Sequence, residues 1–200
     1  MRNNTLRLRQ RLLACSSFAL LSLNAAPALA TDWWMIFGTG DTPNRDIFFA
    51  DAQSVKPAKE HPQNKLLNIM QVFENPNSPN YVSYTLELRC PERQLRVNSV
   101  TAHLRTSSSK VLPAPKRWVP VPRSWLERGY DFACAPEKRK LNGMTPLGGP
   151  FEEMRLVDIA QLGLFTVDQS KPRPRIKAPE TTTEDVMNEL NALLDAPSKK

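Results

Sequence analysis

Alternation of apolar and polar residues is clearest in one ten-residue segment near the middle of the chain. Its apolar positions are Val82, Tyr84, Leu86, Leu88 and Cys90, and its intervening positions are Tyr81, Ser83, Thr85, Glu87 and Arg89. A period of two predicts a β-strand that buries the first set and turns the second toward solvent. The next segment, Gln94 to Leu104, slips by one residue near Asn98 and Ser99, which indicates a β-bulge. The two segments predict an antiparallel hairpin with Cys90 at its end.

Three earlier segments also read as strands. They are Asp32 to Phe37, Arg45 to Asp51 and Lys65 to Glu74. Each is short, rich in aromatic or β-branched residues, and bounded by proline or glycine, which favours strand over helix.

A short helix is predicted from Pro122 to Cys134. Ser124 supplies an N-cap, and Leu126, Tyr130 and Cys134 recur every fourth residue to form one apolar stripe. If this stripe packs on the buried face of the hairpin, it brings Cys134 toward Cys90.

The remaining segments predict a less regular C-terminal part. Thr106 to Pro122 is proline-rich and should run extended over the surface, with Trp118 contacting the domain. Phe151 to Phe165 has helical spacing, and Lys171 to Arg175 reads as a basic linker. The last segment, Thr182 to Leu194, predicts a capped amphipathic helix that either docks on a partner protein or folds back on its own domain.

These elements together predict an α+β fold. We expect a small antiparallel β-sheet backed by a short helix, with one disulfide and a C-terminal tail that is partly helical and partly extended. The expected division is a leader over residues 1–30, a domain over 31–140, and a partly flexible tail over 141–200.

The first thirty residues predict an export signal. Four arginines precede an apolar run from Leu12 to Leu23, and Ala28-Leu29-Ala30 offers a cleavage site. We therefore expect cleavage after Ala30 and a periplasmic, outer-membrane or cell-surface location in a bacterium. Lipidation at Cys15 is the alternative, although Cys15 lies too close to the arginines for the usual order of regions. Without the leader, 23 of the 27 basic residues remain against 20 acidic ones, which lowers the net charge from +7 to +3.

Two cysteines, Cys90 and Cys134, remain once the leader is removed. In an oxidising compartment a single pair is expected to form one disulfide, and the alternative is two separate buried thiols. Neither cysteine lies in a Cys-x-x-Cys pair or near a histidine in sequence, so redox catalysis and zinc binding have little support.

Basic residues gather between Glu87 and Lys140, where twelve Arg or Lys stand against five acids. Outside the cytosol such an excess favours an anionic glycan, a lipid headgroup or an acidic protein over nucleic acid. The candidate ligand-binding residues are Arg89, Arg93, Arg96 and Arg105. Equally, these arginines could be the solvated face and ends of the hairpin, where they would discourage strand pairing between molecules.

Several short motifs resemble the surface-adhesin protein E-like domain of exported bacterial proteins. They are an early tryptophan (Trp33 or Trp34), Phe48-Phe49-Ala50-Asp51 followed by Ser54-Val55, the strand Tyr84 to Cys90, and Trp118-Val119-Pro120-Val121-Pro122 followed by Ser124 and Cys134. The resemblance covers about Thr31 to Ala135 and implies an antiparallel sheet backed by a helix, a Cys90–Cys134 bridge and a binding role at the cell envelope. The founding adhesin is lipid-anchored, and the segment after Lys140 has no counterpart in it.

Motifs of catalysis are missing from the sequence. His61 and His103 have no carboxylate or nucleophile at a recognisable spacing, and no metal-binding, phosphate-binding or nucleophile-elbow motif occurs. We therefore expect no enzyme activity, no cofactor and no metal. The expected function is an adhesin-like binding module that engages host matrix proteins or anionic envelope ligands. The alternative is a periplasmic accessory protein that docks on a partner complex through Thr182 to Leu194.

Overall fold

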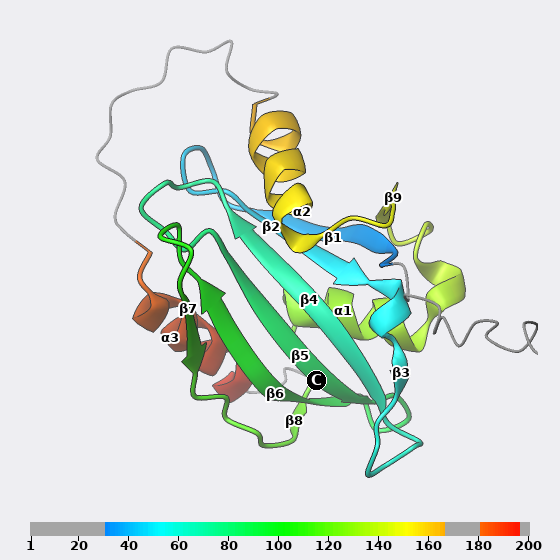
Figure 1. Cartoon of the computed structure of the whole chain (residues 1–200). Helices are drawn as coiled ribbons and strands as arrows, with labels where there is room; N and C mark the ends of the chain where they lie inside the picture. Colours follow the sequence, from blue (N-terminus) through cyan, green and yellow to red (C-terminus); the bar gives the residue numbers. More distant parts are fainter. Residues whose placement is uncertain (1–30, 167–180, 197–200) are drawn as a thin grey trace, which may run out of the picture.

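The computed structural model describes residues 31–166 and 181–196, which form an antiparallel sheet with helices on both faces (Figure 1). The strands are β1 (Trp33–Thr39), β2 (Asp46–Asp51), β3 (Lys56–Pro57), β4 (Lys65–Phe73), β5 (Tyr81–Arg89), β6 (Gln94–His103), β7 (Ser109–Leu112), β8 (Val119–Pro120) and β9 (Thr145–Gly148). Seven of them follow the order β7-β6-β5-β4-β2-β1-β9, while β3 pairs with β4 and β8 pairs with β6. The predicted α+β fold with an antiparallel sheet is confirmed.

The β5–β6 hairpin lies between β7 and β4 in this sheet. Its register pairs Tyr81 with His103 at one end and Arg89 with Gln94 at the other. Thr85 pairs with Ser99 and Leu86 with Val97, so Asn98 is the extra residue of a bulge, as the sequence predicts.

One face of the sheet, which we call the core face, carries the apolar side chains Val82, Tyr84, Leu86 and Leu88 and is covered by two helices. The first is α1 (Trp125–Cys134), which begins where the Ser124 hydroxyl accepts a hydrogen bond from the Leu126 amide. Trp125 of α1 stacks on Phe48 at 4.8 Å between ring centroids. Because α1 lies along the sheet, its last residue reaches the hairpin end, and the predicted Cys90–Cys134 disulfide forms with 5.6 Å between the Cα atoms.

The second helix on the core face is α3 (Thr183–Asp195), which begins with a capping box between Thr182 and Asp185. Its apolar residues belong to the same buried cluster as the core face, and they are Val186, Met187, Leu190 and Leu194. Of the two alternatives for this segment, the structure therefore has the helix folded back on its own domain. The basic linker Lys171 to Arg175 and the leader 1–30 lie outside the described residues.

The opposite face, which we call the open face, is covered by a helix only at one end (Figure 1). There α2 (Glu153–Ile159) continues into one turn of π-helix, η3 (Ala160–Leu164), as the helical spacing predicts. Leu156 and Phe165 from this segment pack against Trp33, Phe49 and Val72 of the sheet. Strand β9, which the sequence pattern did not predict, pairs with β1 and leads into α2. The described parts of 141–200 thus contribute strand β9, the α2–η3 segment and α3 to the packing of the sheet.

Two sequence expectations need correction. Tyr81 and Glu87 were expected to face solvent, but they are 6% and 2% exposed, because Tyr81 lies under α2 and Glu87 lies within a polar network. The proline-rich segment from Thr106 to Pro122 was expected to run over the surface, but β7 and β8 within it pair with β6 and so belong to the sheet.

Candidate functional site on the open face

Helix α2 leaves part of the open face uncovered (Figure 1), and most side chains on this part are polar. Side chains at alternate positions of three neighbouring strands make it up, and they are Leu66 and Asn68 of β4, Ser83, Thr85, Glu87 and Arg89 of β5, and Gln94, Arg96, Asn98, Ser99 and Thr101 of β6. Most of them are half-buried or exposed. A sheet face that carries this much polar surface needs no second layer, so it is available to a ligand.

Glu87 is the centre of a hydrogen-bond network at the hairpin end of this face. The Arg96 guanidinium donates to its Oε2 from Nε at 2.9 Å and from Nη2 at 2.6 Å. Asn64 donates to Oε1 at 2.6 Å, and Asn98 donates to Oε2 at 3.1 Å. Burial of the carboxyl would raise the pKa of Glu87, but these hydrogen bonds and the charge of Arg96 outweigh burial and lower the pKa below its ordinary value. Glu87 is therefore ionised at neutral pH and holds Arg96 in place.

The local sequence explains how this network assembles. The hairpin register places Arg96 directly opposite Glu87, and the bulge turns Asn98 toward the same carboxylate. Asn64 is held just before β4 by backbone hydrogen bonds with His61 and Ala58.

Trp118 lies beside this network and contacts two arginines. The guanidinium carbon of Arg89 is 3.9 Å from the Trp118 ring centroid, and that of Arg96 is 5.0 Å away. Such cation–π contacts hold flexible arginine side chains in defined positions. The expected contact of Trp118 with the domain is therefore seen, and it orders the two cations of the open face.

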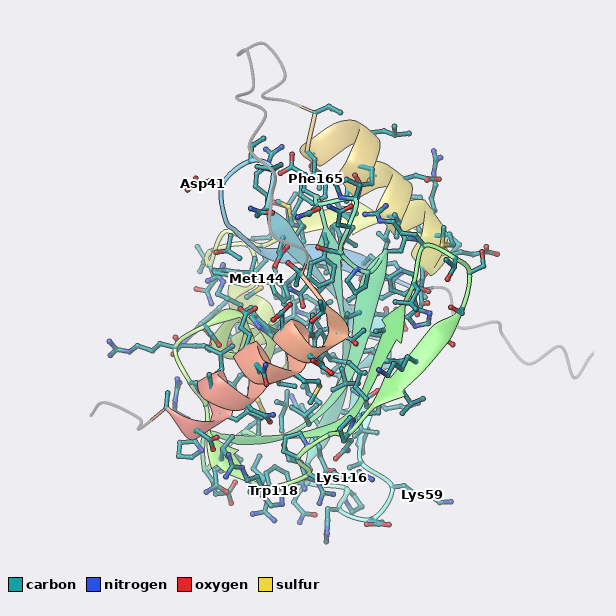
Figure 2. The ribbon with its side chains drawn as sticks, turned by 90° about the vertical axis from the view of Figure 1, so that its left-hand side faces the viewer. Asp41, Lys59, Lys116, Trp118, Met144 and Phe165 are labelled. Atoms are coloured by element: carbon teal, nitrogen blue, oxygen red, sulfur yellow. A yellow bond between two sulfur atoms is a disulfide. The ribbon has the colours of Figure 1, made fainter. Side chains whose placement is uncertain are left out.

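A hollow of about 360 Å³, which we call the basic hollow, opens next to these residues. Its lining includes three basic residues, Lys59, Arg96 and Lys116, two acidic ones, Glu60 and Glu87, and Asn98. Figure 2 shows Lys59, Lys116 and Trp118 at the same end of the molecule.

The two lysines of the basic hollow are exposed, and neither has a salt-bridge partner within the described residues. Lys116 adopts a left-handed backbone with φ of 49°, a strained conformation for a residue with a side chain. Lys59 and Lys116, with no salt-bridge partner in residues 31–166 and 181–196, lie beside Arg96, and together the three cations outnumber Glu60 and Glu87 in this lining. This excess makes the hollow attractive to an anion.

The four predicted arginines do not form one site. Arg89 and Arg96 come together on the open face, as described above. Arg93 turns instead toward α1, where it pairs with Glu127 at 2.9 Å. Arg105 lies at the opposite end of the hairpin and donates to the backbone carbonyls of Ser78 and Asn75. The structure therefore places two of the four beside the basic hollow.

A second hollow, of about 510 Å³, lies farther along the same strands beside the start of α2, and we call it the acidic hollow. It contains three carboxylates and no basic residue, and its lining includes Asp51, Asn68, Ser83, Thr85, Ser99, Thr101, Glu152 and Glu153. Tyr81 donates a hydrogen bond to Glu153 at 2.7 Å, and burial together with this bond raises the pKa of Tyr81. The open face therefore runs from a basic end to an acidic end.

Among the residues that the structure describes, Ser83 and His103 form the one arrangement on this face that resembles catalytic chemistry. The Ser83 hydroxyl and His103 Nε2 are 3.0 Å apart, and His103 stacks on Tyr81 at 4.1 Å. An acyl-transfer site would also need a carboxylate on the other imidazole nitrogen and free amides for an oxyanion. Among the described residues no carboxylate bonds to His103, and Ser83 lies inside the β5–β6 ladder. The pair is a cross-strand hydrogen bond, and the absence of enzyme activity stays a prediction.

Comparisons of the chain with family models, curated proteins and solved structures gave no match. The resemblance to the surface-adhesin protein E-like domain therefore remains an expectation from the sequence motifs. Within residues 31–166 and 181–196, no group of three or more His, Cys, Asp or Glu side chains could hold a metal ion. No helix in the same ranges has the length and apolar character needed to cross a membrane.

Sequence reasoning missed several residues of this site. Lys59 and Lys116 lie in loops without a pattern, and they meet only because β3 pairs with β4 and β8 pairs with β6. One signal could have linked Glu87 and Arg96, because opposite charges on the two strands of a hairpin favour a cross-strand pair, but the hairpin prediction gave no register that set them opposite each other.

Proposed function

We propose that this protein is an exported, non-enzymatic binding module of the bacterial cell envelope that holds acidic ligands at the basic hollow. The single observation that carries the proposal is the pair of exposed lysines, Lys59 and Lys116, beside an Arg96 side chain held in place by Glu87. Exposed cations that form no salt bridge within the described part of the chain, set around a hollow, favour binding of an anionic group. The leader-like first thirty residues and the adhesin-like motifs support a role outside the cytosol.

The alternative function is a periplasmic accessory protein that uses the Thr182 to Leu194 helix to bind a partner. The apolar residues Val186, Met187, Leu190 and Leu194 that would make such a contact are buried in the core. This packing favours the open face over α3 as the binding surface.

The test is binding of the mature protein to immobilised basement-membrane extract, which presents both matrix proteins and acidic glycans. We expect salt-sensitive binding that falls at least about tenfold in the double variant K59E/K116E, because both substitutions reverse charge at the basic hollow. The control is K140E, which makes the charge change of one of these two substitutions at an exposed lysine outside the hollow. Binding that is insensitive to salt, or that falls equally in K140E, would contradict the proposal.

Location is tested separately. Protease treatment of intact cells should degrade the protein if it is surface-exposed, as an adhesin must be. Protection until the outer membrane is opened would favour the accessory role instead.

A further inference from the structure

We infer that the ligand is a glycan chain that ends in one acidic sugar, laid along the strands of the open face with its acidic group in the basic hollow. This inference rests on the proposed function and names the class of ligand. It follows from three properties of the face, which are its length, its hydrogen-bonding chemistry and its charge gradient.

The basic and acidic hollows are parts of one continuous surface. Their linings are neighbours on each strand, with Glu87 of the basic hollow followed by Thr85 of the acidic hollow on β5. On β6, Asn98 of the basic hollow adjoins Ser99 of the acidic hollow. At roughly 3.3 Å per residue, the distance from Arg89 to Ser83 is about 20 Å. A surface of this length fits an extended ligand of several units better than a single small ion.

Between the charged ends, the face offers neutral hydrogen-bonding groups. Thr85 donates to Asn68 Oδ1 at 3.2 Å, which leaves the N–H groups of the Asn68 amide available. The hydroxyls of Ser99 and Thr101 have no hydrogen-bond partner within the described part of the chain. Hydroxyl and amide groups that both donate and accept are the chemistry that recognises sugar hydroxyls.

A protein ligand fits this face less well. Stable protein interfaces depend on apolar or aromatic anchors that enter a pocket at the centre of the contact. The middle of the open face instead presents small polar side chains, namely Asn68, Thr85, Ser99 and Thr101. An extended peptide that adds to a sheet pairs with an edge strand and not with a face.

The charge gradient limits how the acidic groups of the ligand are arranged. The basic hollow attracts an anion through Lys59 and Lys116, whereas Asp51, Glu152 and Glu153 at the other hollow repel one. A polymer with an acidic group on every sugar would place some of these groups against the three carboxylates. A chain with one terminal acidic group followed by neutral sugars avoids this repulsion.

The experiment compares three soluble probes by isothermal titration calorimetry with the mature protein. The probes are sialyllactose, which ends in one acidic sugar with a single carboxylate, lactose, which lacks that whole terminal sugar, and a heparin oligosaccharide, which is sulfated throughout. We expect sialyllactose to bind at least about tenfold more tightly than lactose, since the two differ by the acidic sugar whose carboxylate the basic hollow would hold. We also expect it to bind more tightly than heparin per site.

Two sets of variants assign the ends of the bound chain. K59E/K116E should abolish the preference for sialyllactose over lactose, while K140E leaves it unchanged. T85V and S99A each remove one hydroxyl and should weaken sialyllactose roughly two- to tenfold, the size of one lost hydrogen bond. Thermal unfolding of each variant checks that the fold is intact.

The outcomes separate this inference from the proposed function. Equal binding of lactose and sialyllactose, tighter binding of heparin, or no effect of T85V and S99A would overturn the inference. If none of the three probes binds, while binding to basement-membrane extract still depends on Lys59 and Lys116, the inference fails and the proposed function stands. If binding to the extract also does not depend on these lysines, both the inference and the proposed function fail.

Discussion

The two faces of the central sheet differ in what covers them. The core face lies under α1 and α3, is apolar, and is joined to α1 by the Cys90–Cys134 disulfide. The open face has α2 over one end only, and its other end carries the Glu87 network and the basic hollow. Apolar burial and a covalent link stabilise the fold from one side. The other side can therefore carry charged and polar groups that are arranged for binding a ligand.

The largest expected effect is on the core face. Replacing both cysteines in C90A/C134A removes a link between residues 44 apart in sequence. The chain-entropy model expects the free energy of unfolding to fall by about 4 kcal/mol, because the unfolded chain regains the freedom that the closed loop had restricted. Urea unfolding of the oxidised wild type and the variant measures this loss. A loss below about 1 kcal/mol would mean that helix packing alone holds the core face.

The next effect concerns the buried charge of the open face. E87Q keeps the shape of the side chain but removes the charge that accepts hydrogen bonds from Asn64, Arg96 and Asn98. At pH 7 we expect the free energy of unfolding to fall by about 1.5–3 kcal/mol, the range for hydrogen bonds to a charged group.

The pH dependence of this effect has a definite sign. Because the folded protein lowers the pKa of Glu87 below its ordinary value of 4.5, its stabilisation is present above that value and is lost as pH falls through the folded pKa. The difference between wild type and E87Q should therefore shrink below about pH 4.5. The control is E127Q, since Glu127 pairs with an Arg93 side chain that is 57% exposed and should cost less than about 1 kcal/mol. Equal losses in E87Q and E127Q would remove the contrast between the faces.

The smallest expected effect comes from replacing one helical glycine on each face of the sheet. A Cβ atom at Gly129 of α1 would lie 2.6 Å from Ile69 Cδ1, whereas at Gly163 of η3 it would meet nothing within 4 Å. G129A should lower the free energy of unfolding by about 1–2 kcal/mol, because Ile69 must move within a closed core. G163A should leave it unchanged or raise it by up to about 1 kcal/mol through better helix propensity. Paired thermal melts test this difference, and a stabilising G129A would show that the core face is less tightly packed than it appears from the distances.

The sequence predicted the elements whose pattern reflects a single buried face. Val82 to Leu88 alternate because only one side of β5 lies on the core, and the bulge is visible because that alternation shifts in β6. The α1 helix was predictable from its Ser124 cap and its apolar stripe. In contrast, β9 has no alternation, since its Thr145–Gly148 backbone contributes pairing with β1 and few buried side chains.

The candidate site was harder to predict because contacts between distant segments form it. The direction of Arg93 could not be read from its spacing, since it has a left-handed backbone in the turn and points to α1. Burial of Glu87 depends on Asn64, which reaches it from a loop before β4. The same capped helix would be predicted for α3 whether it bound a partner or its own domain, so only the fold decides between them.

The bulge at Asn98 also restricts how β6 can change in evolution. Before the bulge the odd-numbered residues Leu95 and Val97 are buried, and after it the even-numbered residues Val100 and Ala102 are buried. Deleting or inserting one residue on either side would exchange the inward and outward sets of that half. In related sequences, insertions and deletions within β6 should therefore come in steps of two residues. The position of the bulge should be kept more often than the asparagine that occupies it here.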